Sequence, residues 1–440
     1  NNKNNLKELL KIEEIESKEK LNEILNKIGK TLYYYFEIKD SKEINPISKE
    51  IVSIKVCINE EIYSIKFNDY KEEIKEIFEN ENILKCGYEQ KIDYILLKQS
   101  GIEPKNLMFD VKIAAYLLNS NSNQYKLKEL AIKYLEIDLD EIINPSNATE
   151  QTSLFDEPKD EKENIENEVY SYIISKLEPT LKNELEKINS LKLFNEVEMP
   201  LVEVLAEMQY IGMYADEAGI IKFGNSLKDN LEELKIDIYN YAGEEFNINS
   251  TKQLGEVLFE KLGLPVQKKT KSGYSTDVDV LEKLKGKHPI IEKILDYRQI
   301  TKLNSTYVEG LIPHINEKTG RIHTYFHQTV TATGRLSSTE PNLQNIPTRS
   351  ELGKKVRKVF KPAEGKIFVD ADYSQIELRI LAHMSHDKIM VDAFNENQDI
   401  HTICASKIFD IPVENVSKQL RSRAKAVNFG IVYGISDFGL

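Results

Sequence analysis

Three features are scarce in this 440-residue sequence, and each scarcity excludes a class of protein. The only cysteines, Cys57, Cys86 and Cys404, are scattered, which excludes a disulfide scaffold and a clustered zinc site. No stretch approaches the roughly 18 apolar residues of a membrane span, and the first residues do not resemble a signal peptide. Basic residues are outnumbered, 59 to 72, so a uniformly basic surface is excluded while a local basic groove is not. These absences predict a soluble protein from a reducing, cytoplasmic compartment.

The composition is that of a folded protein, with 40% hydrophobic and 30% charged residues. At roughly 100–200 residues per domain, the length suggests two to four domains. Residues 1–30 have the pattern of a polar helical lead-in, and runs rich in β-branched and aromatic residues predict strands at 32–38, 51–58 and 61–67, the last two forming a hairpin around Asn59. Helical periodicity follows at 71–79, 91–99, 110–119 and 126–135. We therefore expect an α/β or α+β unit of about 160 residues.

From residue 144 onward, polar loops and helical patterns replace the mixed strand and helix pattern of the first part. The polar stretch 144–166 predicts a surface loop, and helical patterns dominate from 167 to 240. A basic loop follows at 265–284, within which Thr276 or Asp277 is expected to cap the next helix. Farther on, the patterns predict a strand at 321–329, a basic loop at 342–360, a buried strand at 366–374 and helices from there to the end.

One candidate site is the segment KIFVDADYSQIELR, which begins at residue 366. Alternation along the predicted strand places Asp370 and Asp372 on the same face near its end. A carboxylate in that place is a natural ligand for a hard cation. Taken alone, two acidic residues at this spacing are more often a surface turn.

A second candidate is the helical segment from 418 to 439, in which Arg421, Lys425, Phe429 and Tyr433 recur every four residues. That spacing forms one stripe along a helix. Two cations followed by two aromatic rings can bind phosphates at one end and stack a base at the other. The alternative is an amphipathic helix with buried rings and solvated cations.

Together these two segments resemble motifs A and B of family A DNA polymerases, of the bacterial DNA polymerase I type. The stretches TATGRLSSTEPNLQNIP (331–347) and DIHTICASKIF (399–409) also resemble conserved stretches of that family, in the same order. The resemblance covers roughly residues 195–440, and the first 190 residues resemble the family's 3′–5′ exonuclease-like domain more weakly.

The resemblance implies a multidomain protein of mixed α/β and α+β class. A ribonuclease-H-like exonuclease domain at 1–190 is followed by part of a right-hand polymerase: a helical thumb at 191–310, a palm with motif A at 311–381 and the start of the fingers at 382–440. In the family, motif C follows motif B, and the sequence ends at Leu440 before any such motif. We therefore expect these 440 residues to be catalytically incomplete on their own.

The resemblance also implies residue roles. Asp372 matches the motif A aspartate that binds two Mg²⁺ ions in the family, with the carbonyl of Tyr373 as a further ligand, whereas Asp370 is expected only to support the strand. Glu377 matches the steric gate that rejects ribose. The residues implied in nucleotide binding are Arg421 and Lys425 on the triphosphate, His401 on a phosphate, Phe429 on the sugar and base, Tyr433 near the template base, and Gln375 and Glu377 at the start of the motif A helix.

DNA contacts are implied in three places. Arg335, Gln344 and Asn345 match residues along the primer–template minor groove, where contacts test pair shape more than sequence. The basic run 354–361 and the loop Lys268–Lys271 are expected against backbone phosphates.

The exonuclease motifs are incomplete. The two acidic positions of the first motif fall on Phe36 and Ile38, and the third-motif segment 169–179 has tyrosines but no aspartate at the required spacing. Asp93 alone keeps a motif carboxylate. We expect a domain that keeps its fold without its nuclease chemistry.

The function implied is template-directed DNA synthesis in replication and repair, with primer–template DNA and deoxynucleoside triphosphates as partners and Mg²⁺ as cofactor. We expect a monomer without membrane association, in the bacterial cytoplasm at the nucleoid. Two alternatives stay open at this point: a 3′–5′ exonuclease whose C-terminal half holds DNA, and a non-catalytic DNA-binding fragment.

Overall fold

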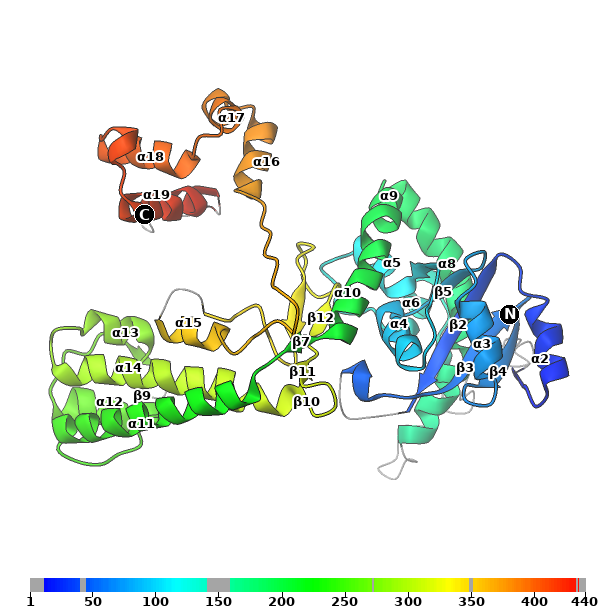
Figure 1. Ribbon diagram of the computed structural model, residues 1–440, viewed down its shortest axis with the longest axis horizontal. Helices are drawn as coiled ribbons and strands as arrows, with labels where there is room; N and C mark the ends of the chain where they lie inside the picture. Colours follow the sequence, from blue (N-terminus) through cyan, green and yellow to red (C-terminus); the bar gives the residue numbers. More distant parts are fainter. Residues whose placement is uncertain are drawn as a thin grey trace. The chain divides into compact units, whose positions relative to one another are not determined.

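The computed structural model describes residues 12–39, 45–140, 159–270, 273–347, 351–432 and 434. The chain divides into two compact units, Asn1–Gly365 and Lys366–Leu440 (Figure 1). Among the described residues, no helix has both the length and the apolar character that crossing a membrane requires.

The first unit begins with a six-stranded mixed sheet in the order β1-β4-β3-β2-β5-β6. The sheet contains β1 (Ile12–Glu14), β2 (Thr31–Ile38), β3 (Ile51–Ile58), β4 (Glu61–Lys66), β5 (Leu84–Gly87) and β6 (Leu107–Asp110). The hairpin predicted around Asn59 is confirmed, because β3 and β4 pair antiparallel across Asn59 and Glu60, whose φ angles are 52° and 71°. Two consecutive positive φ angles give the turn whose twist matches paired strands.

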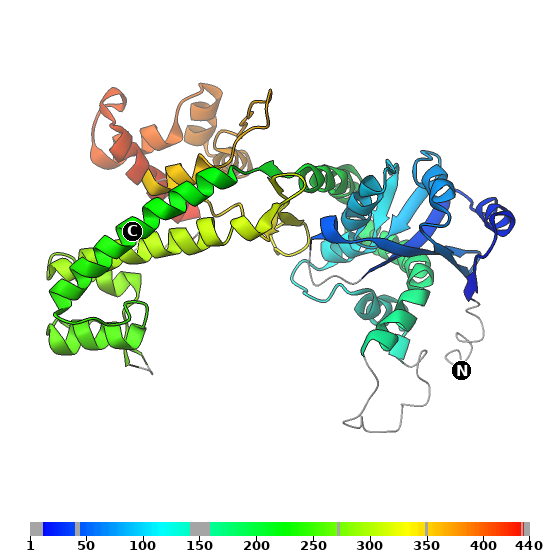
Figure 2. The same ribbon diagram turned by 60° about the horizontal axis from the view of Figure 1, so that its bottom comes forward.

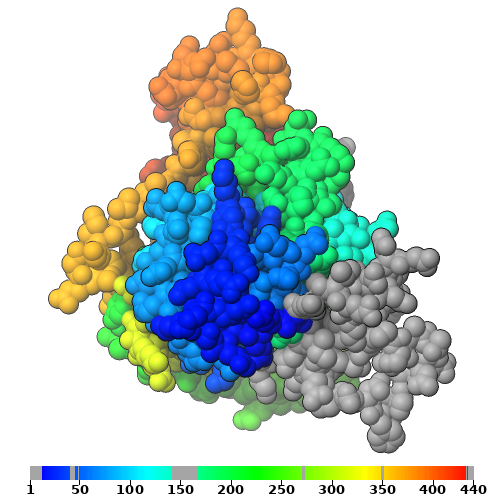
Figure 3. All heavy atoms as spheres, turned by 90° about the vertical axis from the view of Figure 1, so that its right-hand side faces the viewer, coloured from blue at the N-terminus to red at the C-terminus, as the bar shows by residue number. Residues whose placement is uncertain are grey.

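Helices cover both faces of this sheet (Figure 2). They are α2 (Lys18–Leu25), α3 (Lys71–Phe78) and α4 (Gln90–Gln99) against one face, and α5 (Val111–Leu118), α6 (Leu127–Leu135) and α8 (Lys159–Lys187) against the other. In β2, Leu32, Tyr34 and Phe36 belong to the core between the sheet and α2, α3 and α4. The alternate residues Tyr33 and Tyr35 pack against the core on the other face, beneath α5, α6 and α8. Figure 3 views the domain from the side of α2, whose residues lie in the dark blue region at the front.

The local periodicities predicted α3, α4, α5 and α6 to within one residue at each end. Two other predictions are wrong in part. The lead-in is not helical throughout, since residues 12–14 form a strand parallel to β4, and the predicted loop at 144–166 is helical from Lys159 onward. Lysine and glutamate favour helices even without an apolar stripe. Residues 1–11 and 144–158 lie outside the described residues.

A connecting region follows α8. It contains α9 (Leu191–Leu193), η3 (Phe194–Glu198), α10 (Met199–Ile211), β7 (Met213–Tyr214), η6 (Ile312–His314), β10 (Ile315–Asn316), β11 (Arg321–Ile322), β12 (Tyr325–His327) and β13 (Ser337–Thr339). The helical run predicted to 240 breaks at Gly212, which has φ 66° and lies so close to His323 that a Cβ there would be 2.6 Å from the imidazole Nδ1. The segment predicted as one strand at 321–329 instead contains two short strands, β11 and β12, which belong to different sheets.

Two long helices, α11 (Glu217–Ala242) and α14 (Pro289–Asn304), pack along one another and form the helical arm (residues 217–304). Its outer end carries α12 (Thr251–Gly255), η4 (Glu256–Lys261), β8 (Lys269–Thr270), β9 (Gly273–Tyr274) and α13 (Val278–Lys283). Asp216 caps the start of α11, and Gly243 ends it in the left-handed conformation. After α14 come η5 (Ser305–Glu309) and, later, α15 (Glu351–Arg357), a helix within the segment predicted as a basic loop.

The second unit is helical where it is regular. It contains α16 (Ile376–Ser385), α17 (Lys388–Asn395), α18 (Ile400–Phe409), η7 (Val413–Asn415) and α19 (Lys418–Val432) around a small core that includes Leu378, Phe394 and Ile400. The buried strand predicted at 366–374 is wrong. Ile367, Val369 and Tyr373 are 83%, 85% and 80% exposed, and no described strand pairs with this segment. Alternating apolar residues form a strand only where another strand supplies hydrogen bonds.

Candidate functional site

The first feature of the candidate site is the contact between the start of α18 and the start of α19. Asp399 caps α18, accepting hydrogen bonds from the backbone N–H groups of His401 and Thr402. Its second carboxylate oxygen pairs with Arg421 Nε at 2.6 Å. Burial alone raises the pKa of Asp399, but the hydrogen bonds from Arg421 and the backbone outweigh it and the pKa is lowered. The helix cap thereby holds a guanidinium of the predicted stripe.

The second feature is the environment of His401, which is 1% exposed. Its Nδ1 lies 3.1 Å from Asn428 Nδ2 on α19, and its ring centroid lies 5.7 Å from that of Phe429. Burial lowers the pKa of His401, assisted by the nearby cations of Arg421 and Lys425 and opposed by Asp399. A neutral imidazole therefore lies against two positive side chains.

The predicted stripe along α19 is present. Lys425 is exposed, and its Nζ lies 5.7 Å from the centroid of the Phe429 ring. The structure thus brings together Arg421, Lys425, Phe429 and His401, although His401 is distant from the stripe in sequence. Tyr433, the fourth member of the stripe, lies outside the described residues.

The motif A residues lie at the start of α16. Asp372 and Tyr373 are exposed in the irregular segment before the helix, and Glu377 lies in its first turn. Gln375 occupies the N-cap position with φ 54°, and its Oε1 is buried without a hydrogen-bond partner among the described residues. The structure shows no contact among the described residues that joins Asp372 to the α18–α19 cluster.

The described residues contain no group of three or more His, Cys, Asp or Glu side chains placed to bind a metal ion. The Asp372 carboxylate and the Tyr373 carbonyl are nevertheless hard oxygen donors, the kind that Mg²⁺ prefers. The donors present fit the predicted ion in chemical kind.

In the first unit, Arg335, Gln344 and Asn345 lie on either side of β13, in the loop that contains it. Gln344 Nε2 donates to the carbonyl of Leu336 at 3.2 Å, which places it beside Arg335 in the chain. Tyr307 of η5 donates a hydrogen bond to the Asn345 carbonyl. All three predicted residues are exposed, so the loop presents polar side chains on a backbone that is held in place.

The same loop is tied to the N-terminal domain. Tyr116 donates to the Thr331 carbonyl at 2.7 Å and Ser120 to the Ala332 carbonyl at 3.0 Å. These contacts join segments more than 200 residues apart. The N-terminal domain therefore supports a predicted DNA-contacting loop.

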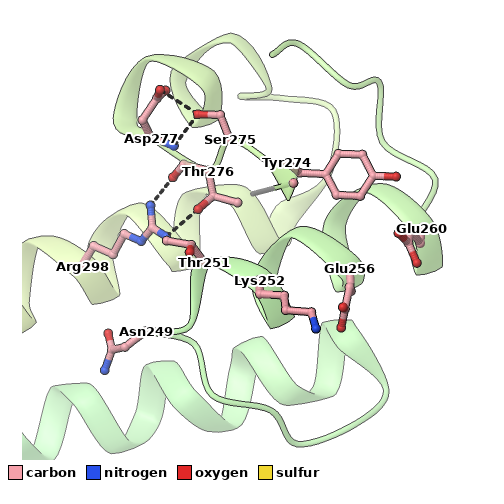
Figure 4. A pocket seen from close by; sticks show the side chains of 11 residues that line it. Asn249, Thr251, Lys252, Glu256, Glu260, Tyr274, Ser275, Thr276, Asp277 and Arg298 are labelled. Atoms are coloured by element: carbon pink, nitrogen blue, oxygen red, sulfur yellow. Dashed lines mark hydrogen bonds between the residues drawn. The ribbon is translucent and has the colours of Figure 1, made fainter. Parts of the chain in front are cut away.

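The outer end of the helical arm contains a polar cavity of about 610 Å³ (Figure 4). Arg298 of α14 donates to both the carbonyl and the hydroxyl of Thr276, and Asp277 caps α13 by accepting from Val280 N at 2.9 Å. The capping prediction is thus settled in favour of Asp277. Lys252 lies beside Glu256 in Figure 4, so the cavity wall carries both signs of charge.

Two basic stretches were predicted to meet DNA phosphates. Lys268 and Lys269 are exposed beside the cavity, whereas Lys271 lies outside the described residues. The stretch 354–361 is partly the helix α15, with Lys354, Lys355, Arg357, Lys358 and Lys361 all exposed. Lys361 pairs with Asp216, and Lys354 pairs with Glu351.

The predicted remnant of the exonuclease site is a packed core. Phe36 is 2% exposed, with its ring centroid 5.2 Å from Tyr34 and 5.4 Å from Phe78, and Ile38 packs against the same core. Asp93 is buried, and Tyr34 donates to its Oδ2 at 2.9 Å. Burial raises the pKa of Asp93 well above its usual range. The surviving carboxyl is thus enclosed by the protein, with one of its oxygens occupied by the Tyr34 hydroxyl.

Two residues of the α18–α19 cluster were missed in the sequence, Asp399 and Asn428. Asp399 carried a signal, because an aspartate directly before a helical run is a common N-cap. Asn428 carried none, since its partner His401 is 27 residues away.

Family models match both parts of the chain. A model described as DNA polymerase I, ribonuclease H-like domain, matches residues 36–144, and one described as DNA polymerase family A matches residues 218–440, just over half of the chain. The chain belongs to DNA polymerase family A. The predicted fold, a ribonuclease-H-like domain followed by part of a family A polymerase, is confirmed.

Its relatives include curated bacterial proteins named DNA polymerase I. Identity is 47% over 335 residues with that of Caldicellulosiruptor bescii (75% of this chain, 37% of the relative), 45% over 375 residues with that of Bacillus subtilis (84% and 42%) and 39% over 450 residues with that of Borreliella burgdorferi (98% and 48%). The chain spans less than half the length of these relatives.

A solved structure is also similar: the POL domain of Pol1 from M. smegmatis, in complex with a DNA primer–template and a dNTP. The TM-score is 0.84 at 31% identity, covering 98% of this chain and 72% of that one. The family A chain described here therefore shares that fold over nearly all of its length.

Proposed function

We propose that this chain supplies the nucleotide-binding and part of the DNA-binding surface of a template-directed DNA polymerase that acts in replication and repair. The observation that carries the proposal is the α18–α19 cluster, where Arg421, Lys425 and Phe429 lie beside a buried histidine. A triphosphate needs cations and hydrogen-bond donors, and a base or sugar needs an aromatic face. The similar M. smegmatis structure, which contains DNA and a dNTP, supports this proposal.

In this proposal Arg421 and Lys425 bind the triphosphate, His401 donates to a phosphate oxygen, and Phe429 packs on the sugar and base, with Tyr433 near the template base. Gln375 and Glu377 line the sugar, and Glu377 rejects ribose by crowding its 2′ position. Asp372 and the Tyr373 carbonyl hold Mg²⁺, which when bound would acidify the primer hydroxyl and stabilise pyrophosphate.

DNA binding is proposed for three surfaces of the first unit. Arg335, Gln344 and Asn345 read pair shape in the minor groove, while α15 and the tip of the helical arm contact phosphates. The proposed domain limits are those of the sequence: 1–190, 191–310, 311–381 and 382–440. The proposed setting is a monomer in the bacterial cytoplasm, associated with the nucleoid.

We further propose that the N-terminal domain is not a proofreading nuclease. Phe36 and Ile38 fill the first-motif positions with apolar packing, and the surviving Asp93 is sealed by Tyr34. This argues against the exonuclease alternative. The domain instead supports the loop at 331–345 through Tyr116 and Ser120.

Single-nucleotide primer extension by the full-length protein tests the proposal. We expect incorporation of the nucleotide complementary to the template base, and no release of nucleotides from a single-stranded primer in Mg²⁺. Incorporation that ignores the template, or rapid release of nucleotides by the protein, would contradict it. Duplex binding without incorporation would favour the non-catalytic alternative.

A further inference from the structure

The side chain of His401 is held in a directed chain of hydrogen bonds. Cys404 Sγ lies 2.9 Å from Asn428 Oδ1, and Asn428 Nδ2 lies 3.1 Å from His401 Nδ1. A thiol on one side of the amide and a ring nitrogen on the other give each amide atom a partner. With the thiol donating to Oδ1, the amide Nδ2–H donates to Nδ1 of the ring.

The other ring nitrogen has no such partner. His401 Nε2 is buried and lacks a hydrogen-bond partner among the described residues, on a side chain that is 1% exposed. A buried polar atom without a partner is costly and calls for an explanation. Around it lie Arg421 and Lys425 from α19 and Asp399 at the cap of its own helix, so the surrounding charge is mainly positive.

The chemistry of a phosphate ligand determines which ring nitrogen of His401 must carry the proton. Phosphate oxygens of a nucleotide accept hydrogen bonds, so a neutral imidazole binds them only through a nitrogen that carries the proton. If Nδ1 accepts from Asn428, the proton of the neutral ring is on Nε2. The unpartnered atom is then a donor, in a place where an anion would satisfy it.

We propose that Asn428 is a positioning residue, which fixes His401 as the neutral Nε2–H tautomer so that Nε2–H donates to a phosphate oxygen of the incoming nucleotide. This inference rests on the proposed function for its ligand. Its structural half, the tautomer, stands independently of that function. Burial lowers the pKa of His401, in keeping with a neutral ring.

The tautomer is measured on the 440-residue chain, without nucleotide, by long-range ¹H–¹⁵N correlation of chain labelled with ¹⁵N-histidine. The seven histidines are sorted by comparison with His401→Gln. We expect the Nε2–H pattern for His401 at neutral pH. An Nδ1–H pattern, or an imidazolium at pH 7.5, overturns the proposal even if the protein is an active polymerase.

The key variant is Asn428→Asp, whose carboxylate accepts only and so requires a proton on Nδ1. The ring then donates through Nε2 only as an imidazolium, and its pKa rises beside the new charge. In the full-length polymerase we expect the KM for the nucleotide to increase about tenfold from pH 6 to pH 8.5 in this variant, the value of a hydrogen bond to a charged group. Over the same range the unaltered protein should change less than about twofold, and kcat of the two should follow the same pH profile.

Two controls separate this effect from added charge and from misfolding. Ala426→Asp places a carboxylate two residues away on an exposed part of α19 and should give no pH-dependent KM. The double variant His401→Gln/Asn428→Asp keeps a neutral amide donor at 401 and should lose the pH dependence. A pH-dependent KM that persists in the double variant, or that also arises in Ala426→Asp, contradicts the proposal. A full-length protein without polymerase activity refutes the proposed function but leaves the tautomer measurement decisive.

Discussion

Phe36, at one of the two positions where the sequence predicted a lost first-motif carboxylate, is packed among the rings of Tyr34, Phe67 and Phe78. Asp93 is also buried, and its Oδ2 accepts a hydrogen bond from the Tyr34 hydroxyl. Because the surrounding core is apolar, we expect that replacing a single residue does not create a metal site here.

Phe36→Asp should therefore destabilise the domain and give no nuclease. Truncating a buried phenylalanine and burying a carboxylate together cost about 3–5 kcal/mol. Urea unfolding measures the loss, with Phe36→Leu as the control that keeps an apolar side chain and most of the stability. Nucleotide release by Phe36→Asp in Mg²⁺, or a stability equal to that of Phe36→Leu, would show that the region is not the closed core described.

Glu377 and Phe429 are expected to control sugar selection separately. Glu377→Ala removes the group that crowds the 2′ position, so ribonucleotides should compete better in the full-length polymerase, with dideoxynucleotide rejection retained. Phe429→Tyr adds a hydroxyl that can replace a hydrogen bond lost with the 3′-OH, which is worth about 1 kcal/mol or several-fold in selectivity. Competition between each analogue and its normal nucleotide on one primer–template measures both ratios. Equal shifts of both ratios in both variants would show that the two residues do not have these separate places.

Helices α4 and α10 meet through a buried amine. Lys91 Nζ lies 2.6 Å from Gln209 Oε1 and 3.7 Å from the centroid of the Tyr325 ring. Burial lowers the pKa of Lys91 from 10.5 to about 7. The unfolded chain therefore binds a proton between about pH 7 and 10.5 that the folded chain does not. The free energy of unfolding should therefore rise with pH across that window. Below the window the folded chain also carries the buried charge, and the full destabilisation is then present.

Lys91→Met should lose this pH dependence. Relative to this variant, the unaltered chain should gain about 2 kcal/mol of unfolding free energy between pH 7 and pH 9. Lys98→Met is the control, because Lys98 on the same helix pairs with Glu103 and Glu207 and its pKa is raised, so that no change is expected below pH 9. Parallel stability curves for the unaltered chain and Lys91→Met would refute a depressed pKa at Lys91.

Helix α15 and the residues directly after it are expected to contact DNA through exposed lysines. Replacing Lys355 and Lys358 by alanine should weaken duplex binding and reduce the slope of log K against log salt by about 2, at roughly 0.9 per phosphate contact. Titrations of a labelled primer–template at several salt concentrations measure the slope. Lys71→Ala/Lys75→Ala on α3 removes the same charge from the N-terminal domain and should leave the slope unchanged. Equal slopes for both double variants would place the phosphate contacts elsewhere.

Elements defined by local signals could be predicted from the sequence. The β3–β4 hairpin depends on two adjacent turn residues, and α3 to α6 on apolar periodicity within each segment. The strand predicted at 366–374 failed because its alternation says nothing about a partner strand. Asn428 was missed because its partner His401 is 27 residues away. Asp399 carried a local capping signal, but its pairing with Arg421, 22 residues away, could not be read from it.

At the scale of the whole molecule, the order of the motifs was enough to predict the family, and the family models confirm it. The sequence did not indicate which contacts join the N-terminal domain to the residues that follow it. Its Tyr116 and Ser120 hold the backbone at 331–332, and its Lys91 meets α10. We infer that the N-terminal domain, for which we propose no nuclease chemistry, supports the proposed DNA-contacting loop.

The central claim is that these residues form part of a metal-dependent polymerase, and Asp372→Ala in the full-length protein tests it most directly. The rate of single-nucleotide incorporation at saturating nucleotide is measured beside duplex affinity, with Asp370→Ala as the matched control two residues earlier. We expect Asp372→Ala to lose at least about a hundredfold in rate, roughly 2.7 kcal/mol, because a metal ligand acts on the transition state. Asp370→Ala should stay within about threefold, and both should bind duplex normally, since affinity comes mainly from cations. A loss smaller than about a hundredfold in Asp372→Ala, or an equal loss in Asp370→Ala, would contradict the account.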